Sequence, residues 1–370
     1  ATPVELTPAP WNLRSRIHEY GGGAVAIAGD HIVVVDDHDR CLWHLDLQGL
    51  QAGAPEASDF KRLTPAVEGS GERAFADGLL DLPRQRWLGV MEANGRDQLV
   101  TVPLSGGAPQ LLHQAADFCG YAVLSPSGRQ LAWIEWQQPA MPWEQSSLWL
   151  AEVAADGSLL TPRAIAGMAA GAPGESLFQP LWIQPPGEPE TLVVASDRSG
   201  FWNLLARSAD GGWQPLLSLE AEFAMPQWVY GMRTAAWDGE RLLALCCRQG
   251  AWELGDVPLD GGDWRPVPLP FNDLAYLDAA AGQVVAVASG PTWGPGLLQL
   301  DLASSSWNHT PASAQPCPLR PEQISQPEGL WFEGHGGQPT QAWYYPPSTG
   351  ASAEAPLLVI AAPPPWRGPA

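Results

Sequence analysis

LWHLDL, at Leu42–Leu47, is the first of six short segments that share a length and an apolar pattern. The other five are Leu99–Leu104 (LVTVPL), Leu148–Val153 (LWLAEV), Asn203–Ser208 (NLLARS), Leu254–Leu259 (LGDVPL) and Leu297–Leu302 (LLQLDL). Their first residues lie 57, 49, 55, 51 and 43 residues apart. A repeat of about 50 residues that contains only strands is typical of a β-propeller, in which each repeat forms one four-stranded blade.

Two further apolar runs precede each repeated segment, and a polar turn and an outer strand follow most of them. The innermost strands are expected at Ala24–Ala28, Gly78–Leu82, Tyr121–Ser125, Pro180–Gln184, Val229–Ala236 and Leu274–Ala279. The repeated segment is then the third strand of its blade. The sequence therefore predicts an all-β propeller with six complete four-stranded blades, over residues 20–312.

The N-terminal end differs from the repeat. Pro3–Pro8 (PVELTP) is similar to the outer strand Arg62–Pro65 (RLTP), so residues 1–10 are expected to be the remnant of a preceding blade. The first residue is not Met, and we therefore expect a fragment of a longer protein. The propeller is assigned to residues 1–316.

At the C-terminal end the Pro-rich segment Pro311–Pro321 interrupts the repeat. Residues 317–370 are predicted to be a linker followed by the first strands of a second domain. Glu328–Phe332 and Gln341–Tyr345 are expected to form a hairpin, with His335-Gly336-Gly337 at its tip. Pro356–Ala361 (PLLVIA) is expected to form one more strand.

The charge and the cysteines limit the possible partners and compartment. With 19 Lys and Arg against 40 Asp and Glu, the net charge of −21 argues against nucleic-acid binding. No apolar run is long enough to span a bilayer, and we expect no signal peptide from the first residues. The five irregularly spaced cysteines favour reduced thiols and a cytoplasmic setting. No metal site or cofactor is expected: Asp36–Asp39 lacks the ligand pattern of a calcium loop and fits a hairpin turn.

Five stretches in order resemble the prolyl oligopeptidase family of serine peptidases, in its dipeptidyl- or acylaminoacyl-peptidase-like branch. They are RSRIHEYGGG (Arg14–Gly23), SPSGRQLAW (Ser125–Trp133), SDRSGFWNL (Ser196–Leu204), PQWVYG (Pro226–Gly231) and the exit segment Ile324–Pro347. The resemblance implies a seven-bladed propeller, with its first blade largely missing here. It also implies an α/β-hydrolase domain, of which only the first strands are present.

That hydrolase domain would carry a Ser/Asp/His triad that cleaves short peptides. No serine in this chain has Gly two residues before it and two after it, as the nucleophile turn requires. Where the family has His-Gly-Gly-Pro, this chain reads Ala362–Arg367 (APPPWR). We therefore assign no catalytic residue and predict a noncatalytic propeller, inactive alone, that gates or orients peptides for the hydrolase domain.

The candidate substrate-binding residues are Arg16, His18, Glu19 and Tyr20, within RSRIHEYGGG. Glu19 could hold the charged amino terminus of a peptide at the mouth of the propeller, because a desolvated charge pair is strong. The alternative is a loop that only packs against a neighbouring blade or domain.

The sequence is compatible with two other functions. One is a stand-alone propeller that binds protein partners. The other is a carbohydrate-active propeller, which would require two close carboxylates in its central channel. An incomplete ring would also expose blade faces, so we expect self-association.

Overall fold

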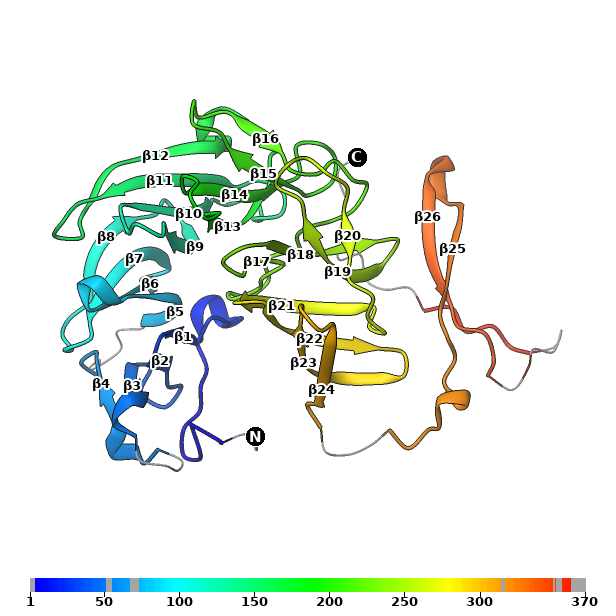
Figure 1. Ribbon diagram of the computed structural model, residues 1–370, viewed down its shortest axis with the longest axis horizontal. Coiled ribbons are helices and arrows are strands. Elements are labelled where there is room, and N and C mark those ends of the chain that lie inside the picture. Colours follow the sequence, from blue (N-terminus) through cyan, green and yellow to red (C-terminus); the bar gives the residue numbers. More distant parts are fainter. Residues whose placement is uncertain are drawn as a thin grey trace.

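A computed structural model describes residues 4–50, 55–66, 73–313, 317–348, 350 and 355–360. The described chain is almost entirely β-structure, with only short 3-10 turns between the strands. Six four-stranded antiparallel sheets follow one another around an arc, and a two-stranded hairpin stands beside them (Figure 1). The predicted all-β propeller with six blades is confirmed.

The blades are meanders whose strands succeed one another from the centre outward. The inner strands are β1 (Val25–Ala28), β5 (Arg73–Asp81), β9 (Phe118–Leu124), β13 (Leu177–Ile183), β17 (Ala235–Trp237) and β21 (Asp273–Ala280). The second strands are β2 (His31–Val35), β6 (Arg86–Ala93), β10 (Gln130–Trp136), β14 (Thr191–Ser196), β18 (Leu242–Arg248) and β22 (Gln283–Gly290).

Each third strand contains most of its repeated segment, as predicted. They are β3 (Leu42–Asp46), β7 (Arg96–Pro103), β11 (Ser147–Val153), β15 (Asn203–Arg207), β19 (Ala251–Val257) and β23 (Trp293–Asp301). The outer strands are β4 (Phe60–Arg62), β8 (Gln110–Gln114), β12 (Leu159–Gly167), β16 (Trp213–Pro215), β20 (Arg265–Pro266) and β24 (Ser306–Pro311).

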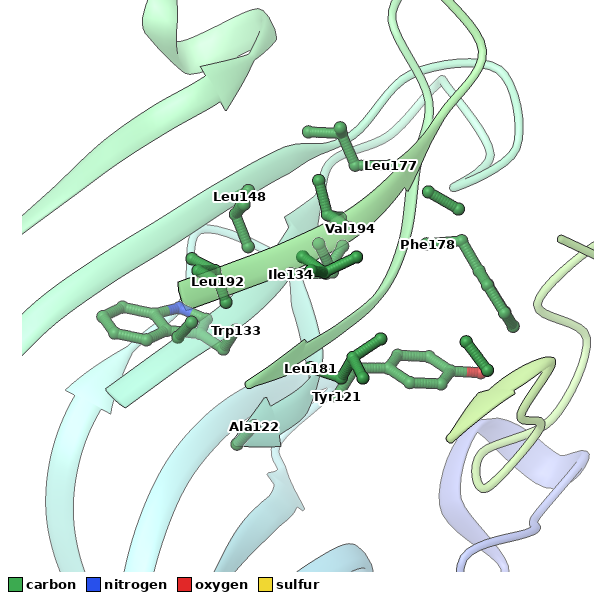
Figure 2. Close-up of a cluster of buried hydrophobic side chains, with 14 of the residues drawn as sticks. Tyr121, Ala122, Trp133, Ile134, Leu148, Leu177, Phe178, Leu181, Leu192 and Val194 are labelled. Carbon is green, nitrogen blue, oxygen red and sulfur yellow. The ribbon is translucent and has the colours of Figure 1, made fainter. Parts of the chain in front are cut away.

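The core lies between the faces of neighbouring blades. Figure 2 shows it at the third and fourth blades, where Ile134 of β10 and Leu148 of β11 lie beside Leu192 and Val194 of β14. These four side chains are buried, because a central strand of a blade is covered on both faces. Burial of each such side chain contributes about 1.5–3 kcal/mol, so the stacking of blades is the main source of stability.

The inner strands do not follow a simple alternating pattern. In β5, β9, β13 and β21 the pairing register shifts at a bulge. One residue of each bulge has a positive φ: Asp77, Tyr121, Gln179 and Tyr276. These bulges join the blades, because the Asp77 N–H donates to the Gly23 carbonyl (2.9 Å) and Gln179 Oε1 accepts the Thr234 N–H (2.7 Å).

Some predicted strand limits are therefore wrong. β5 begins at Arg73, ahead of the predicted start, because its bulge hides the alternation of the first residues. Val229–Ala236 is a strand only from Ala235. The residues before it bond across to other blades, as the Tyr230 N–H does to the Gly21 carbonyl (3.2 Å).

The described part of PVELTP, residues 4–8, forms no strand. Leu6, Trp11 and Leu13 instead pack on the outer face of the first blade, against the buried Ile32 and Phe60. The segment thus covers this face with side chains and pairs only through an isolated bridge between Leu13 and Asp36. A preceding blade stays a prediction.

The expected hairpin after the propeller is confirmed as β25 (Glu328–Glu333) and β26 (Pro339–Tyr344), with His335–Gly337 at its tip. The strand expected at Pro356–Ala361 is not: Pro356–Ile360 has no strand pairing, and Ala361 lies outside the described residues. Leu357–Ile360 are 75–81% exposed, because nothing in the described chain covers them.

The two faces of the sixth blade differ. One face packs on the fifth blade through buried residues such as Val284, Ala286 and Leu298. On the opposite face Val285, Val287 and Leu297 are 36–45% exposed, although Val287 and Leu297 are cross-strand partners in the middle of the sheet. An apolar face of this kind marks an interaction surface.

We therefore expect the chain to associate with itself at rising concentration, through this face. Val287→Lys should weaken the association by at least about tenfold, because it places a charge in the contact. Leu111→Lys, at an exposed residue of β8, is the control and should leave it unchanged. Sedimentation equilibrium measures the effect, and a monomer over the whole concentration range would show the expectation to be wrong.

Candidate functional site

One side of the propeller carries several of the segments quoted in the sequence analysis, among them Arg14–Gly23 and Pro226–Gly231. In a four-stranded meander, the start of the inner strand and the turn between the second and third strands lie on the same side. Residues 14–23, 94–95, 137–146, 197–200, 226–234 and 249–250 occupy these positions. We call this side the loop face.

The hairpin β25–β26 also lies on the loop face. Gln341 Nε2 donates to the Gln249 carbonyl (3.0 Å), and the Trp343 ring packs where a side chain on Gly250 would stand. The chain that leaves the propeller is thus placed on the same side as RSRIHEYGGG.

RSRIHEYGGG is a tightly held loop. His18 and Glu19 have φ values of 49° and 65°, and three glycines with positive φ follow. The Gly21 N–H donates to the Ile17 carbonyl (2.9 Å), and Gly22 forms a bridge with Tyr230 of the PQWVYG segment. A backbone this far from ordinary conformations persists only where its surroundings fix it.

A buried polar network anchors the loop. His18 Nε2 lies 2.9 Å from Asp97 Oδ1, and Asp97 Oδ2 accepts the Cys119 N–H (3.1 Å). The Tyr230 hydroxyl lies 3.0 Å from Asp97 Oδ2 and 2.5 Å from the Cys119 carbonyl. Asp97 is completely buried, and the network connects the first, second, third and fifth blades.

The four candidate residues have different surroundings. Arg16 forms a bidentate pair with Asp37, which lowers the pKa of that carboxyl. His18 is partly buried in the Asp97 network. Glu19 is exposed, and its carboxylate makes no hydrogen bond or ion pair with any described residue. Tyr20 is 65% exposed.

Arg16 and Glu19 line one cavity of about 360 Å³, whereas His18 and Tyr20 line a shallow neighbouring depression. The four candidates therefore lie on one loop. Glu19 and Tyr20 are on opposite sides of it, and each lines a different hollow. Arg40, Arg73, Ala74, Glu92, Asn94 and Gly95 complete the larger cavity.

A central cavity of about 370 Å³ lies among β5, β9, β13, β17 and β21. Its polar residues include Asp77, Arg233 and Asp278. Arg233 Nη1 lies 3.5 Å from Asp278 Oδ2. Burial raises the pKa of Asp77, although the carboxyl accepts the Tyr121 N–H. Asp77 and Asp278 therefore do not form a pair of free carboxylates, because Arg233 neutralises Asp278.

The SDRSG turn stabilises the fourth blade. Arg198 Nε and the Ser196 hydroxyl both donate to Glu175 Oε1, at 2.8 and 2.6 Å, and Asp197 Oδ1 accepts the Ser176 N–H at 2.7 Å. Burial raises the pKa of Asp197 to about 6, which the Ser176 N–H opposes and the nearby Glu175 charge reinforces. These contacts give the turn a structural role.

This pKa predicts a pH dependence of stability. Between about pH 4 and pH 6 the folded chain holds a proton on Asp197 that the unfolded chain releases, so the free energy of unfolding falls as the pH rises. Asp197→Asn should flatten the fall, because asparagine keeps the acceptor and does not ionise. Urea unfolding at pH 4, 5, 6 and 7 measures it, with Asp260→Asn, in an exposed turn, as the control.

Asp97 and Tyr230 are the important residues that the sequence analysis did not assign. Tyr230 lies in a quoted motif, whereas Asp97 is the second residue of β7. The two residues are 133 positions apart in the sequence, so only the folded structure shows that they belong to one network. Among the described residues no group of His, Cys, Asp or Glu is arranged to hold a metal ion, and no helix is long and apolar enough to cross a membrane.

Comparison with known proteins gives no match to a family model and no match to a curated protein. Solved structures do match. A variant of puromycin hydrolase complexed with PGG is 29% identical, with a TM-score of 0.80 over 92% of this chain and 53% of its own. A puromycin-hydrolyzing peptidase of Mycobacterium tuberculosis is 29% identical, with a TM-score of 0.81 over 93% and 52%.

Prolyl oligopeptidase B from Galerina marginata, bound to a 35mer substrate, shares the fold alone, at 11% identity and a TM-score of 0.64 over 90% of this chain and 46% of its own. The solved structures that match are puromycin hydrolases and prolyl oligopeptidases, and the propeller architecture they share covers most of this chain. The chain spans about half the length of the puromycin hydrolases it matches.

Proposed function

We propose that this chain is the noncatalytic propeller of a serine peptidase and orients short peptides by their amino terminus. The observation that carries the proposal is Glu19. Its carboxylate is exposed beside a cavity, unpaired within the described chain, and held by a backbone of positive φ. An ammonium group is the natural partner for such a carboxylate, because a charge-assisted hydrogen bond is about twice as strong as a neutral one.

The position of Glu19 supports a role in orientation. The loop face carries both RSRIHEYGGG and the hairpin β25–β26, so a peptide held at Glu19 would face whatever follows the hairpin. From the family resemblance we infer that a hydrolase domain follows, with β25–β26 among its first strands. The chain itself has no nucleophile turn, so the chemistry belongs to the rest of the protein.

The proposal also includes a seventh blade and the gating of peptides. A seventh blade would cover the exposed face of the sixth blade, and the gating of peptides would use the central cavity between the inner strands. The cytoplasmic setting rests on the five cysteines, which are all free thiols in the structure. The similarity to puromycin hydrolase favours this function over a stand-alone binding propeller or a carbohydrate-active one.

Peptide binding to the chain tests the proposal. Phe-Gly-Gly with a free amino terminus should bind at least about tenfold more tightly than its N-acetylated form, because acetylation removes the charge that Glu19 pairs with. Glu19→Gln should abolish this difference. Glu240→Gln, at an exposed turn on the opposite side of the propeller, is the matched control. Ligand-observed NMR measures the affinities.

Equal affinity for the free and acetylated peptides would overturn the assignment of Glu19. So would a free-amine preference that survives Glu19→Gln.

A further inference from the structure

The larger cavity on the loop face, which Glu19 lines, lies between the first two blades. Its walls come from RSRIHEYGGG, from the turn between β2 and β3, from the start of β5, and from the end of β6 with the turn that follows it. Six of its eight lining residues have charged or amide side chains. Charged walls determine which ligand charges a cavity accepts. We call this hollow the charged cavity.

The charges of the cavity balance. Arg16 is already paired with Asp37. The other charged lining residues are two arginines and two glutamates: Arg40, Arg73, Glu19 and Glu92. A cavity with both signs of charge and no net charge favours a zwitterion, because a ligand with one charge would leave the opposite groups without a partner.

Arg40 provides a free cation at a fixed position. It lies in the turn between β2 and β3 with a φ of 55°, and its N–H donates to the Asp36 carbonyl (2.8 Å). Its exposed guanidinium forms no hydrogen bond or ion pair with any described residue, and so none with the Glu19 carboxylate in the same cavity. The guanidinium is therefore available to a ligand.

Arg73 is a second cation, held rigidly at the wall of the charged cavity. Its Nη2 donates to the Pro65 carbonyl, and its guanidinium carbon lies 5.1 Å from the centre of the Phe75 ring. Its Nε is buried and has no hydrogen-bond partner among the described residues. Because a buried donor without a partner is costly, an acceptor oxygen that reaches this guanidinium is favoured.

The size of the cavity limits the length of the ligand. A sphere of about 360 Å³ is about 9 Å across, and an extended chain spans about 3.3–3.6 Å per residue. Two or three residues therefore fill the charged cavity, so both termini of a di- or tripeptide lie against its walls. The carboxylate of a longer peptide bound at Glu19 would lie outside it.

We propose that the charged cavity binds both ends of a di- or tripeptide, with the amine at Glu19 and the carboxylate on Arg40 and Arg73. This inference rests on the proposed function of Glu19 and extends it to the other end of the ligand. Arginine suits this role, because its planar guanidinium donates two parallel hydrogen bonds to one carboxylate. The propeller then recognises short peptides with two free termini and discriminates against longer or C-terminally blocked ones.

The test compares Phe-Gly-Gly with its C-terminal amide, both with free amino termini, by ligand-observed NMR. We expect the acid to bind at least about tenfold more tightly, the effect of a charge-assisted hydrogen bond. Arg40→Gln should reduce this preference to less than about threefold and leave the effect of N-acetylation unchanged. Arg129→Gln, at an exposed turn on the opposite side of the propeller, is the matched control and should keep the full preference.

A length comparison gives a second measurement on the unaltered chain. Phe-Gly-Gly should bind at least about fivefold more tightly than Phe-Gly-Gly-Gly-Gly-Gly, whose carboxylate extends beyond the cavity. Arg73→Gln should also lower the preference for the acid over the amide.

Equal affinity for the acid and the amide would overturn the inference, and so would a preference for the acid that survives both Arg40→Gln and Arg73→Gln. Equal affinity for the tripeptide and the hexapeptide would show that the carboxylate lies outside the charged cavity. Loss of the acetylation effect in the unaltered chain would instead overturn the proposed function of Glu19, so the two failures are distinguishable.

Discussion

Replacing Gly22 with alanine is expected to lower the free energy of unfolding by about 3–5 kcal/mol. Gly22 has a φ of 89° and bridges to Tyr230. A methyl group at this position would overlap the Tyr230 carbonyl and would lie 2.6 Å from the Tyr230 nitrogen. Both are backbone atoms, so the contact between the N-terminal loop and the fifth blade would have to open. Urea unfolding of the variant measures the loss.

Gly95→Ala separates the two causes of that loss. Gly95 also has a positive φ, 71°, but nothing lies within 4 Å of its missing side chain. It should cost only the backbone strain, about 1 kcal/mol. If Gly22→Ala were no more destabilising than Gly95→Ala, the close approach to Tyr230 would be incorrect.

Asp97→Ala is expected to lower the free energy of unfolding by about 2–4 kcal/mol. The buried Cys119 N–H loses its acceptor, and His18 loses the partner that fixes the loop. The same variant should weaken peptide binding that depends on Glu19, since the loop then loses its anchor. Urea unfolding and the acetylation comparison measure the two effects.

Asp97→Asn should cost less than Asp97→Ala, because the amide oxygen can still accept one hydrogen bond. Asp260→Ala, at an exposed turn, should change the stability by no more than about 0.5 kcal/mol. An Asp97→Ala variant as stable as Asp260→Ala would show that the network does not hold the loop face together.

The fold was predictable because its signal repeats. Each third strand, such as Leu42–Asp46, carries the same apolar pattern, and six copies outweigh the ambiguity of one. The inner strands were less predictable. Asp77 and Tyr121 adopt positive φ although neither is glycine, so the bulges leave no mark in the sequence.

The sequence motif identified the candidate loop, but it did not reveal the surroundings of each side chain. The sequence singles out Arg16, His18, Glu19 and Tyr20 together, whereas in the structure each has a separate environment. Arg16 is neutralised by Asp37, and His18 is tied to Asp97, across 79 residues of sequence. The strand expected at Pro356–Ala361 is not confirmed, and an apolar run forms a strand only where a partner strand is available to pair with it.

A crystal structure of the chain with bound Phe-Gly-Gly is the most direct test of the account. We predict that the peptide nitrogen lies about 3 Å from a Glu19 carboxylate oxygen. A peptide bound instead in the central cavity beside Asp77 and Asp278, or one whose carboxylate rather than its amine faces the Glu19 loop, would contradict it.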